Sequence, residues 1–272
     1  MTQPKFSEST EFGRYYRNPN RQQLYPSITN IKKLKAIDAL PGWAARECAD
    51  YAIDRWQQLS GLDPVERRAL IKGSPWRVDP DKPSASQIGD IVHDWIDGYV
   101  RGSTINPETY LDARGDEHKS PLQAKQMWRQ FGGWVERYHP KFYASEFTVW
   151  SDTHGYAGTA DLGAWIGQGA NAPLVLIDHK TGNGVYPDTA MQLAALSHAD
   201  VILQDDGTET PIPHFDRYAI LHIRPRYTQF VPVQHVEDWF QAFLGLKKLF
   251  DVVVECESST LAMAPKVEVR AS

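Results

Sequence analysis

A short apolar run that ends in charged residues is the feature that most constrains this chain. Residues 174–177 are Leu-Val-Leu-Ile, and Gly169 and Pro173 lie just before them. A short apolar run between turn-forming residues is typical of a buried strand. Asp178 and Lys180 follow, and because they are two residues apart, an extended chain places both side chains on one face. The sequence therefore predicts a buried strand with a carboxylate and an ammonium group at its end.

Two upstream segments are predicted to be strands of the same sheet, and each contains one acid. Residues 144–150 are rich in β-prone side chains and include Glu146, and residues 158–166 include Asp161. The intervening Ser-Asp-Thr-His-Gly at 151–155 is typical of a hairpin turn. We therefore expect a three-stranded meander that brings one acid from each strand to a common region.

The acids and the lysine are residue types that can hold a divalent metal and activate water. Mg²⁺ and Mn²⁺ prefer oxygen ligands, and Mg²⁺ usually takes one or two protein carboxylates beside water and substrate phosphate. Asp161 and Asp178 are candidate ligands, while the Lys180 ammonium would orient water or stabilise negative charge in the transition state. Either acid alone would more often be a turn former on a solvated surface. The combination favours a metal site.

A helix with a histidine on its flank is predicted ahead of the strands. Residues 87–100 carry apolar side chains at helical spacing, and Ser84 or Ser86 is the candidate cap. His93 lies at the edge of the apolar stripe, beside Gly89. A histidine there is most often a half-exposed surface residue, but the acids favour the alternative of a metal ligand. A nitrogen ligand would favour Mn²⁺ relative to an all-oxygen site.

The remainder of the chain is expected to place helices around the sheet. We expect residues 1–26 to be irregular, residues 27–72 to be helical with breaks at 41–42 and 61–64, and residues 73–84 to form a connector. Further helices are predicted at 120–138, 187–203 and 235–253, and further strands at 217–223 and 229–233. The expected division is a mostly helical extension packed on the core at 1–84, the core at 85–257, and a flexible tail at 258–272.

Composition excludes several classes of protein. The chain has 272 residues, of which 42% are hydrophobic, enough for one sizeable core. No apolar stretch approaches the roughly 18 residues that a membrane span needs, and the first residues lack a signal-peptide core. Cys48 and Cys256 are the only cysteines, too few for an iron–sulfur cluster within one subunit. We therefore expect a cytoplasmic protein with no membrane partner and no iron–sulfur cluster.

Charge is unevenly distributed along the chain. The net charge is −5, which argues mildly against a general nucleic-acid binder, yet residues 1–77 carry 13 Lys and Arg against 8 Asp and Glu. Two basic clusters stand out: Lys32, Lys33 and Lys35, and Arg67, Arg68 and Lys72. Each is either a phosphate-binding face or a solvated helix face.

The predicted helix with His93 and the three predicted strands with their acids follow one another in the order found in the PD-(D/E)XK nuclease superfamily. The chain resembles its RecB-type nucleases and the related phage exonucleases over about residues 85–225. The matching pieces are Gly89-x-x-x-His93, Glu146, Gly158-Thr159-Ala160-Asp161, Ile177-Asp178-His179-Lys180-Thr181-Gly182 and Gln192. The resemblance implies an α/β fold with a restriction-endonuclease-like core (helix, three-stranded meander, helix, strand) and a helical N-terminal extension.

The resemblance also assigns roles to residues of the site. It implies that His93, Asp161 and Asp178 hold the metal, with the backbone carbonyl of His179 as a further ligand. Lys180 would position the nucleophilic water. Glu146 would be a supporting acid, or an occasional ligand through water.

One helical motif departs from the family pattern. In the family, a glutamine at the position of Gln192 belongs to a Gln-x-x-x-Tyr motif beside the active site. Here the tyrosine position is Leu196. Tyr186, just before the helix, is the candidate replacement. The departure puts the DNA-contacting role of this motif in doubt, and leaves the metal site unaffected.

The implied activity is hydrolysis of DNA that depends on Mg²⁺ or Mn²⁺. An exonuclease of recombination or repair, encoded by a phage, is the main expectation. An endonuclease, a catalytically silent DNA-binding relative, and a metal enzyme acting on another phosphoester or a sugar remain alternatives. The expected partners are DNA and a recombination or single-strand annealing protein.

Overall fold

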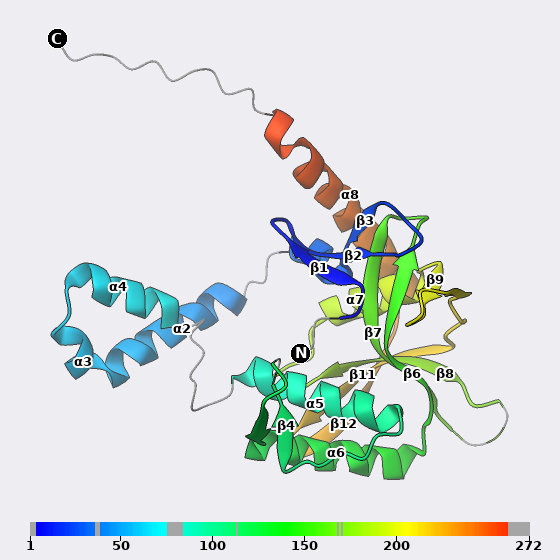
Figure 1. Ribbon diagram of the computed structural model, residues 1–272, viewed down its shortest axis with the longest axis horizontal. Helices are drawn as coiled ribbons and strands as arrows, with labels where there is room; N and C mark the ends of the chain where they lie inside the picture. Colours follow the sequence, from blue (N-terminus) through cyan, green and yellow to red (C-terminus); the bar gives the residue numbers. More distant parts are fainter. Residues whose placement is uncertain are drawn as a thin grey trace.

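One seven-stranded sheet organises the chain, which is mixed α/β (Figure 1). The computed structural model describes residues 4–35, 39–74, 84–112, 114–167, 169 and 171–260. The strand order is β10-β9-β6-β7-β8-β11-β12, and only the β8–β11 pair is parallel. The strands are β6 (Lys141–Ser151), β7 (Tyr156–Trp165), β8 (Leu174–Lys180), β9 (Val201–Leu203), β10 (Glu209–Pro211), β11 (Arg217–Arg224) and β12 (Tyr227–Val233). The expected meander of three strands is therefore present as β6-β7-β8.

Helices cover both faces of this sheet, which explains the uninterrupted apolar run in β8. Val175 and Ile177 pack against α5 (Ala85–Val100) and α6 (Leu122–Tyr138) on one face. Leu174 and Leu176 pack against α7 (Asp188–Ser197) and α8 (Val236–Thr260) on the other. A strand buried on both faces needs apolar side chains at consecutive positions rather than at alternate ones.

Helix α5 begins as the sequence predicts. Ser84 is its N-cap and forms a capping box, because its hydroxyl accepts from the Gln87 N–H while the Gln87 side chain accepts from the Ser84 N–H. The predicted apolar stripe is buried, with Val92 and Ile96 almost completely inaccessible.

The N-terminal residues form a small antiparallel sheet, so the expectation of irregular structure at 1–26 was wrong for the described part. Its strands are β1 (Ser7–Thr10), β2 (Gly13–Arg17) and β3 (Leu24–Pro26). Tyr16 is buried and its hydroxyl lies 2.9 Å from the Thr159 hydroxyl on β7, while Tyr25 stacks on Trp150. Aromatic rings supply the burial here, and the arginines between them hide the strand pattern in the sequence.

A short helix links this small sheet to a separate group of helices. Helix α1 (Ile28–Lys32) packs on β7 and α7. Helices α2 (Ala39–Asp54), α3 (Trp56–Ser60) and α4 (Pro64–Gly73) contact one another and stand apart from the large sheet (Figure 1). Within this extension, β2, β3 and α1 contact strand β7 of the large sheet.

One expected helix break was correct and one was wrong. The break at 61–64 is present, and Asp63 caps α4 by accepting from the Val65 N–H at 2.8 Å. The expected break at 41–42 is absent, because Pro41 falls in the first turn of α2, where a backbone N–H has no intrahelical partner. Of the expected connector at 73–84, residues 75–83 lie outside the described residues.

Further segments along the chain differ from expectation. Helix α7 ends at Ser197 rather than at 203, because residues 201–203 pair with β6 as strand β9. Residues 258–260 continue α8 instead of starting a loose tail, and residues 261–272 lie outside the described part. A hairpin of β4 (Thr109–Leu111) and β5 (Glu117–Lys119) was not expected.

Among the described residues, no helix is long and apolar enough to cross a bilayer.

A glycine sets the distance between α5 and the end of β8. A Cβ added at Gly89 would lie 2.7 Å from the Thr181 hydroxyl oxygen, closer than such atoms approach in folded proteins. Gly89 therefore lets the helix that carries His93 sit directly against the residue after Lys180.

We predict that Gly89→Ala fails to give the usual stabilisation of alanine over glycine in a helix. Gly133→Ala in α6, where an added Cβ meets nothing within 4 Å, should raise the free energy of unfolding by about 0.5–1 kcal/mol. Gly89→Ala should lower the free energy of unfolding. The decrease should be smaller when Thr181 is also alanine, because the hydroxyl that the new Cβ meets is then absent. Urea unfolding measures all four variants, and equal gains for the two glycine substitutions would contradict the close contact.

Candidate metal centre

In β6 and β7, the alternation of side chains between the two faces of the sheet is interrupted at Glu146 and Asp161. Phe147 of β6 packs on the α7–α8 side, whereas the Ser145 hydroxyl donates to Asp97 of α5 on the opposite side, with 2.5 Å between the oxygens. Residues two apart in a regular strand share a face, so the alternation is broken between them. Glu146 breaks it by adopting a left-handed backbone with φ 45°.

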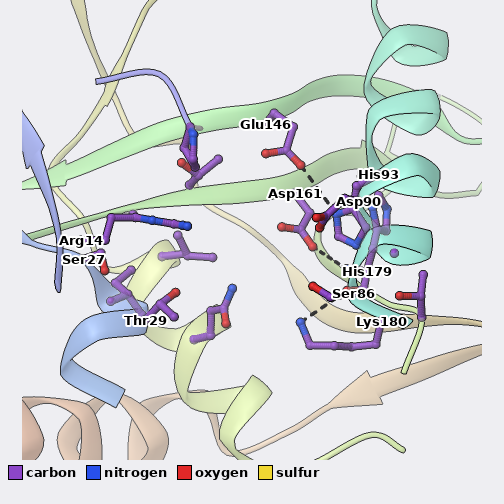
Figure 2. A pocket seen from close by; sticks show the side chains of 18 of the residues that line it. Arg14, Ser27, Thr29, Ser86, Asp90, His93, Glu146, Asp161, His179 and Lys180 are labelled. Atoms are coloured by element: carbon purple, nitrogen blue, oxygen red, sulfur yellow. Dashed lines mark hydrogen bonds and ion pairs between the residues drawn. The ribbon is translucent and has the colours of Figure 1, made fainter. Parts of the chain in front are cut away.

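The neighbouring strand changes face at the matching position. Ala160 belongs to the core on the α7–α8 side, while Leu162 belongs to the core on the α5–α6 side. Asp161 lies between them, opposite the interruption at Glu146, and the paired register of the strands skips both residues. Glu146 and Asp161 consequently point out of the pairing and into an adjoining cavity (Figure 2).

This cavity has a volume of about 390 Å³ and is lined from several distant parts of the chain. The sheet contributes Glu146, Asp161, His179 and Lys180, and α5 contributes His93 and other residues. Arg14, Ser27 and Thr29 of the N-terminal segment line the far side, facing the acids (Figure 2).

Three of these side chains form a cluster with the spacing of a metal site. The ligand atoms of His93, Asp161 and His179 all lie within 4.8 Å of one another. The two imidazole rings meet edge to face at 5.4 Å between centroids. His93 Nδ1 lies 3.8 Å from the Glu146 carboxylate, and only 15% of the His93 side chain is exposed. His93 is thus part of this cluster and not a half-exposed surface residue.

The ring of His179 is the member that the sequence did not indicate. We expected only its backbone carbonyl near a metal, but the ring joins the cluster, and the carbonyl accepts from Lys180 Nζ at 3.4 Å. Its backbone N–H donates to Asp161 at 2.7 Å. The signal was available in the strand period, because residue 179 continues the face of Val175 and Ile177, which is the face that α5 covers.

Asp178 and Lys180 occupy the other face of β8, as their spacing predicts. The Asp178 side chain is 1% exposed and forms an ion pair with the Lys180 ammonium. Apart from that ion pair, neither carboxylate oxygen of Asp178 has a hydrogen-bond partner among the described residues. Asp178 does not belong to the three-residue cluster, so the structure brings together only part of the expected ligand set.

The residues present fit a divalent cation. Buried polar atoms are normally hydrogen-bonded, yet among the described residues Asp178 Oδ1 and His179 Nε2 have no partner, and Asp178 Oδ2 has only the Lys180 ammonium. A carboxylate with free lone pairs and a neutral imidazole are groups that a cation satisfies. Two imidazoles in the cluster suit Mn²⁺ better than Mg²⁺.

Burial and neighbouring charges shift the pKa values of these groups. Burial, followed by the nearby His93, lowers the pKa of His179 to about 3, so its ring is neutral at pH 7. Burial raises the pKa of Asp178, and Lys180 opposes this rise. Burial alone would lower the pKa of His93, but Glu146 and Asp161 outweigh it and raise that pKa.

The chain after Lys180 is held by β11, a contribution that the sequence did not reveal. His222 Nε2 lies 2.8 Å from the Gly182 carbonyl, and Arg224 donates to the Thr181 carbonyl and to the Asn183 side chain. His222 is in register with Lys180 across the parallel β8–β11 pair. Recognising this from sequence would have required knowing which strand lies beside β8.

Two further cavity residues belong to the helices. Asp90 precedes His93 by three residues on α5, a spacing that places both on one helix face, and it also lines the cavity. Gln192 of α7 lines the cavity as expected, and its side-chain oxygen accepts from Lys32 Nζ at 3.1 Å. The proposed stand-in Tyr186 is 58% exposed and lies outside the lining of this cavity, so it does not replace the missing phenol.

No family model and no curated protein matches this chain.

We predict that His93→Ala weakens Mn²⁺ binding. One of three clustered ligand groups is lost, and we expect the affinity to fall by at least ~10-fold. His118→Ala, in the β4–β5 hairpin with 47% of its side chain exposed, is the matched control and should bind as the unaltered protein does. Calorimetric titration with Mn²⁺ compares them, and equal affinities would exclude His93 as a ligand.

A second prediction separates Lys180 from the ligands. An ammonium group cannot coordinate a cation, so Lys180→Ala should retain Mn²⁺ affinity or raise it slightly by removing a nearby positive charge. Asp161→Ala removes a carboxylate of the cluster and should abolish measurable binding. Loss of binding in both variants would show that Lys180 organises the site rather than acting beside it.

Proposed function

We propose that this chain is a divalent-metal-dependent DNA nuclease of the PD-(D/E)XK type, which hydrolyses phosphodiester bonds. The observation that carries the proposal is the convergence of Asp161, the Asp178–Lys180 pair and His93 from two neighbouring strands and the preceding helix. The residue types and their order are those that the motifs imply. A paired carboxylate and ammonium beside an acid–imidazole cluster suits attack of water on a phosphate.

The arrangement of elements supports a restriction-endonuclease-like core. Helix α5 precedes the β6-β7-β8 meander, α7 follows it, and β11 then pairs in parallel with β8. This matches the expected order of helix, three strands, helix and strand, with β9 and β10 added at the far edge.

Each side chain has a distinct role in the proposed reaction. His93, Asp161 and His179 would hold the metal, with Asp178 as the neighbouring carboxylate. A bound Mg²⁺ or Mn²⁺ would supply polarisation of a phosphoryl oxygen and a lower pKa for water. The Lys180 ammonium orients the attacking water and stabilises negative charge on the phosphate. Glu146 fixes the His93 ring through the contact at Nδ1.

An exonuclease is the activity that the cavity supports best. Its volume of about 390 Å³ is that of a small-molecule site, which suits a nucleotide-sized group at a strand end better than a continuous duplex. We further propose a role in DNA recombination or repair, with a recombination or single-strand annealing protein as a partner and the cytoplasm as the compartment. The role and the partner rest on the family resemblance alone, and the compartment rests on the composition of the chain.

The experiment is cleavage of end-labelled linear DNA with Mg²⁺, Mn²⁺ or EDTA. Asp178→Ala should lower the rate by at least ~100-fold, because it removes a main electrostatic element of the site. EDTA should abolish cleavage. Asp251→Ala in α8, whose carboxylate pairs with Lys247 away from the cavity, is a matched control. Full activity of Asp178→Ala, or cleavage in EDTA, would refute the proposed assignment.

Covalently closed circular DNA provides the second arm of this experiment. An exonuclease degrades the linear form and spares the closed circle. Rapid loss of the circle would instead favour an endonuclease. Metal binding without cleavage of either form would favour the catalytically silent DNA-binding relative.

A further inference from the structure

The N-terminal segment packs against α7 at one wall of the cavity. Leu196 is 2% exposed and lies beside Ile28 of α1 over the surface of Gly158. A Cβ added at Gly158 would lie 2.6 Å from Ile28 Cδ1 and 3.2 Å from Leu196 Cδ2. The apolar Leu196 therefore packs against α1 and brings no polar group to this wall of the cavity.

The same short helix brings a lysine to Gln192. Ser27 caps α1, and Ile28 and Ile31 are buried in the core on the α7–α8 side, which fixes the position of Lys32. The Lys32 side chain is 12% exposed, and its ammonium lies 3.2 Å from Asp188 and 3.1 Å from the Gln192 side-chain oxygen. Lys33, the next residue, is exposed.

This contact determines how the Gln192 amide is turned. An ammonium only donates hydrogen bonds, so the amide oxygen must face Lys32 and the NH₂ group must point away from it. No hydrogen bond from that NH₂ to another described residue is present, although Gln192 lines the cavity. Burial lowers the pKa of Lys32, and the nearby Asp188 opposes that shift.

We propose that Lys32 is a positioning residue, which holds the Gln192 amide so that its NH₂ donates to a phosphate oxygen of a nucleic-acid strand in the cavity. The ligand class is a phosphodiester strand, because an oriented amide donor backed by a cation suits an anionic oxygen acceptor. This proposal rests on the proposed nuclease function. It gives α1 a role in orienting a side chain of α7.

The test compares Lys32→Met, Gln192→Ala and the double variant with Lys33→Met as the control. The probe is a short fluorescent single-stranded DNA, with anisotropy measured in Mn²⁺ on an Asp178→Ala background so that no cleavage intervenes. Lys32→Met and Gln192→Ala should each weaken binding by about tenfold or more, the scale of a hydrogen bond to a charged group. The double variant should be no weaker than Gln192→Ala alone, because both changes remove one interaction.

Further measurements distinguish a positioning role of Lys32 from a purely structural one. Mn²⁺ affinity, measured by calorimetry in the cleavage-competent protein, should be unchanged by Lys32→Met, and the cleavage KM should rise while kcat stays within about threefold. Lys32→Arg, which keeps a charged donor, should recover part of the binding. Additive losses in the double variant, equal binding by the Lys32→Met and Lys33→Met proteins, or a joint loss of Mn²⁺ affinity would each overturn the proposal.

The outcome for Lys32 is separable from the outcome for the nuclease. Oligonucleotide binding that depends on Lys32 and Gln192 in a protein that never cleaves DNA would refute only the nuclease function. Cleavage with unaltered binding in Lys32→Met would refute only the role of Lys32.

Discussion

The left-handed backbone of Glu146 is the constraint on which the rest of the site depends. A non-glycine residue at φ 45° costs of order 1–3 kcal/mol, and surrounding contacts must hold it there. Ser145 is bound to Asp97, and Arg101 donates to the Ser145 carbonyl at 3.3 Å, so both anchors come from α5 or its C-cap. The faces of β6 and β7 exchange at this point, where Glu146 and Asp161 line the cavity together with His93 of α5.

The sequence predicted those parts of the fold whose burial is local and apolar. The β8 run and α5 were correct because their patterns report directly which side chains are buried. The N-terminal sheet was missed because its burial comes from tyrosines that contact strands more than 100 residues away. The strand period places the ring of His179 on the face of Val175 and Ile177, but that α5 brings His93 to this face is known only from the structure.

The cavity brings basic and acidic side chains together. Arg14 and Lys180 line it with Asp90, Glu146 and Asp161, and Lys32 binds the Gln192 side chain at its wall. The basic cluster of Lys32, Lys33 and Lys35 does not form one surface, because Lys32 is largely buried beside Asp188 whereas Lys33 is exposed to solvent.

The contact between Tyr16 and Thr159 spans 143 residues of sequence. During synthesis, the segment that forms one wall of the cavity leaves the ribosome first, long before the strand on which it docks exists. Contacts of such separation are costly to close and form slowly compared with a local hairpin. The β6-β7-β8 meander can assemble from neighbouring residues, whereas the enclosed cavity cannot. The wall that the N-terminal segment forms can therefore close the cavity only after the strand that carries Thr159 has been made.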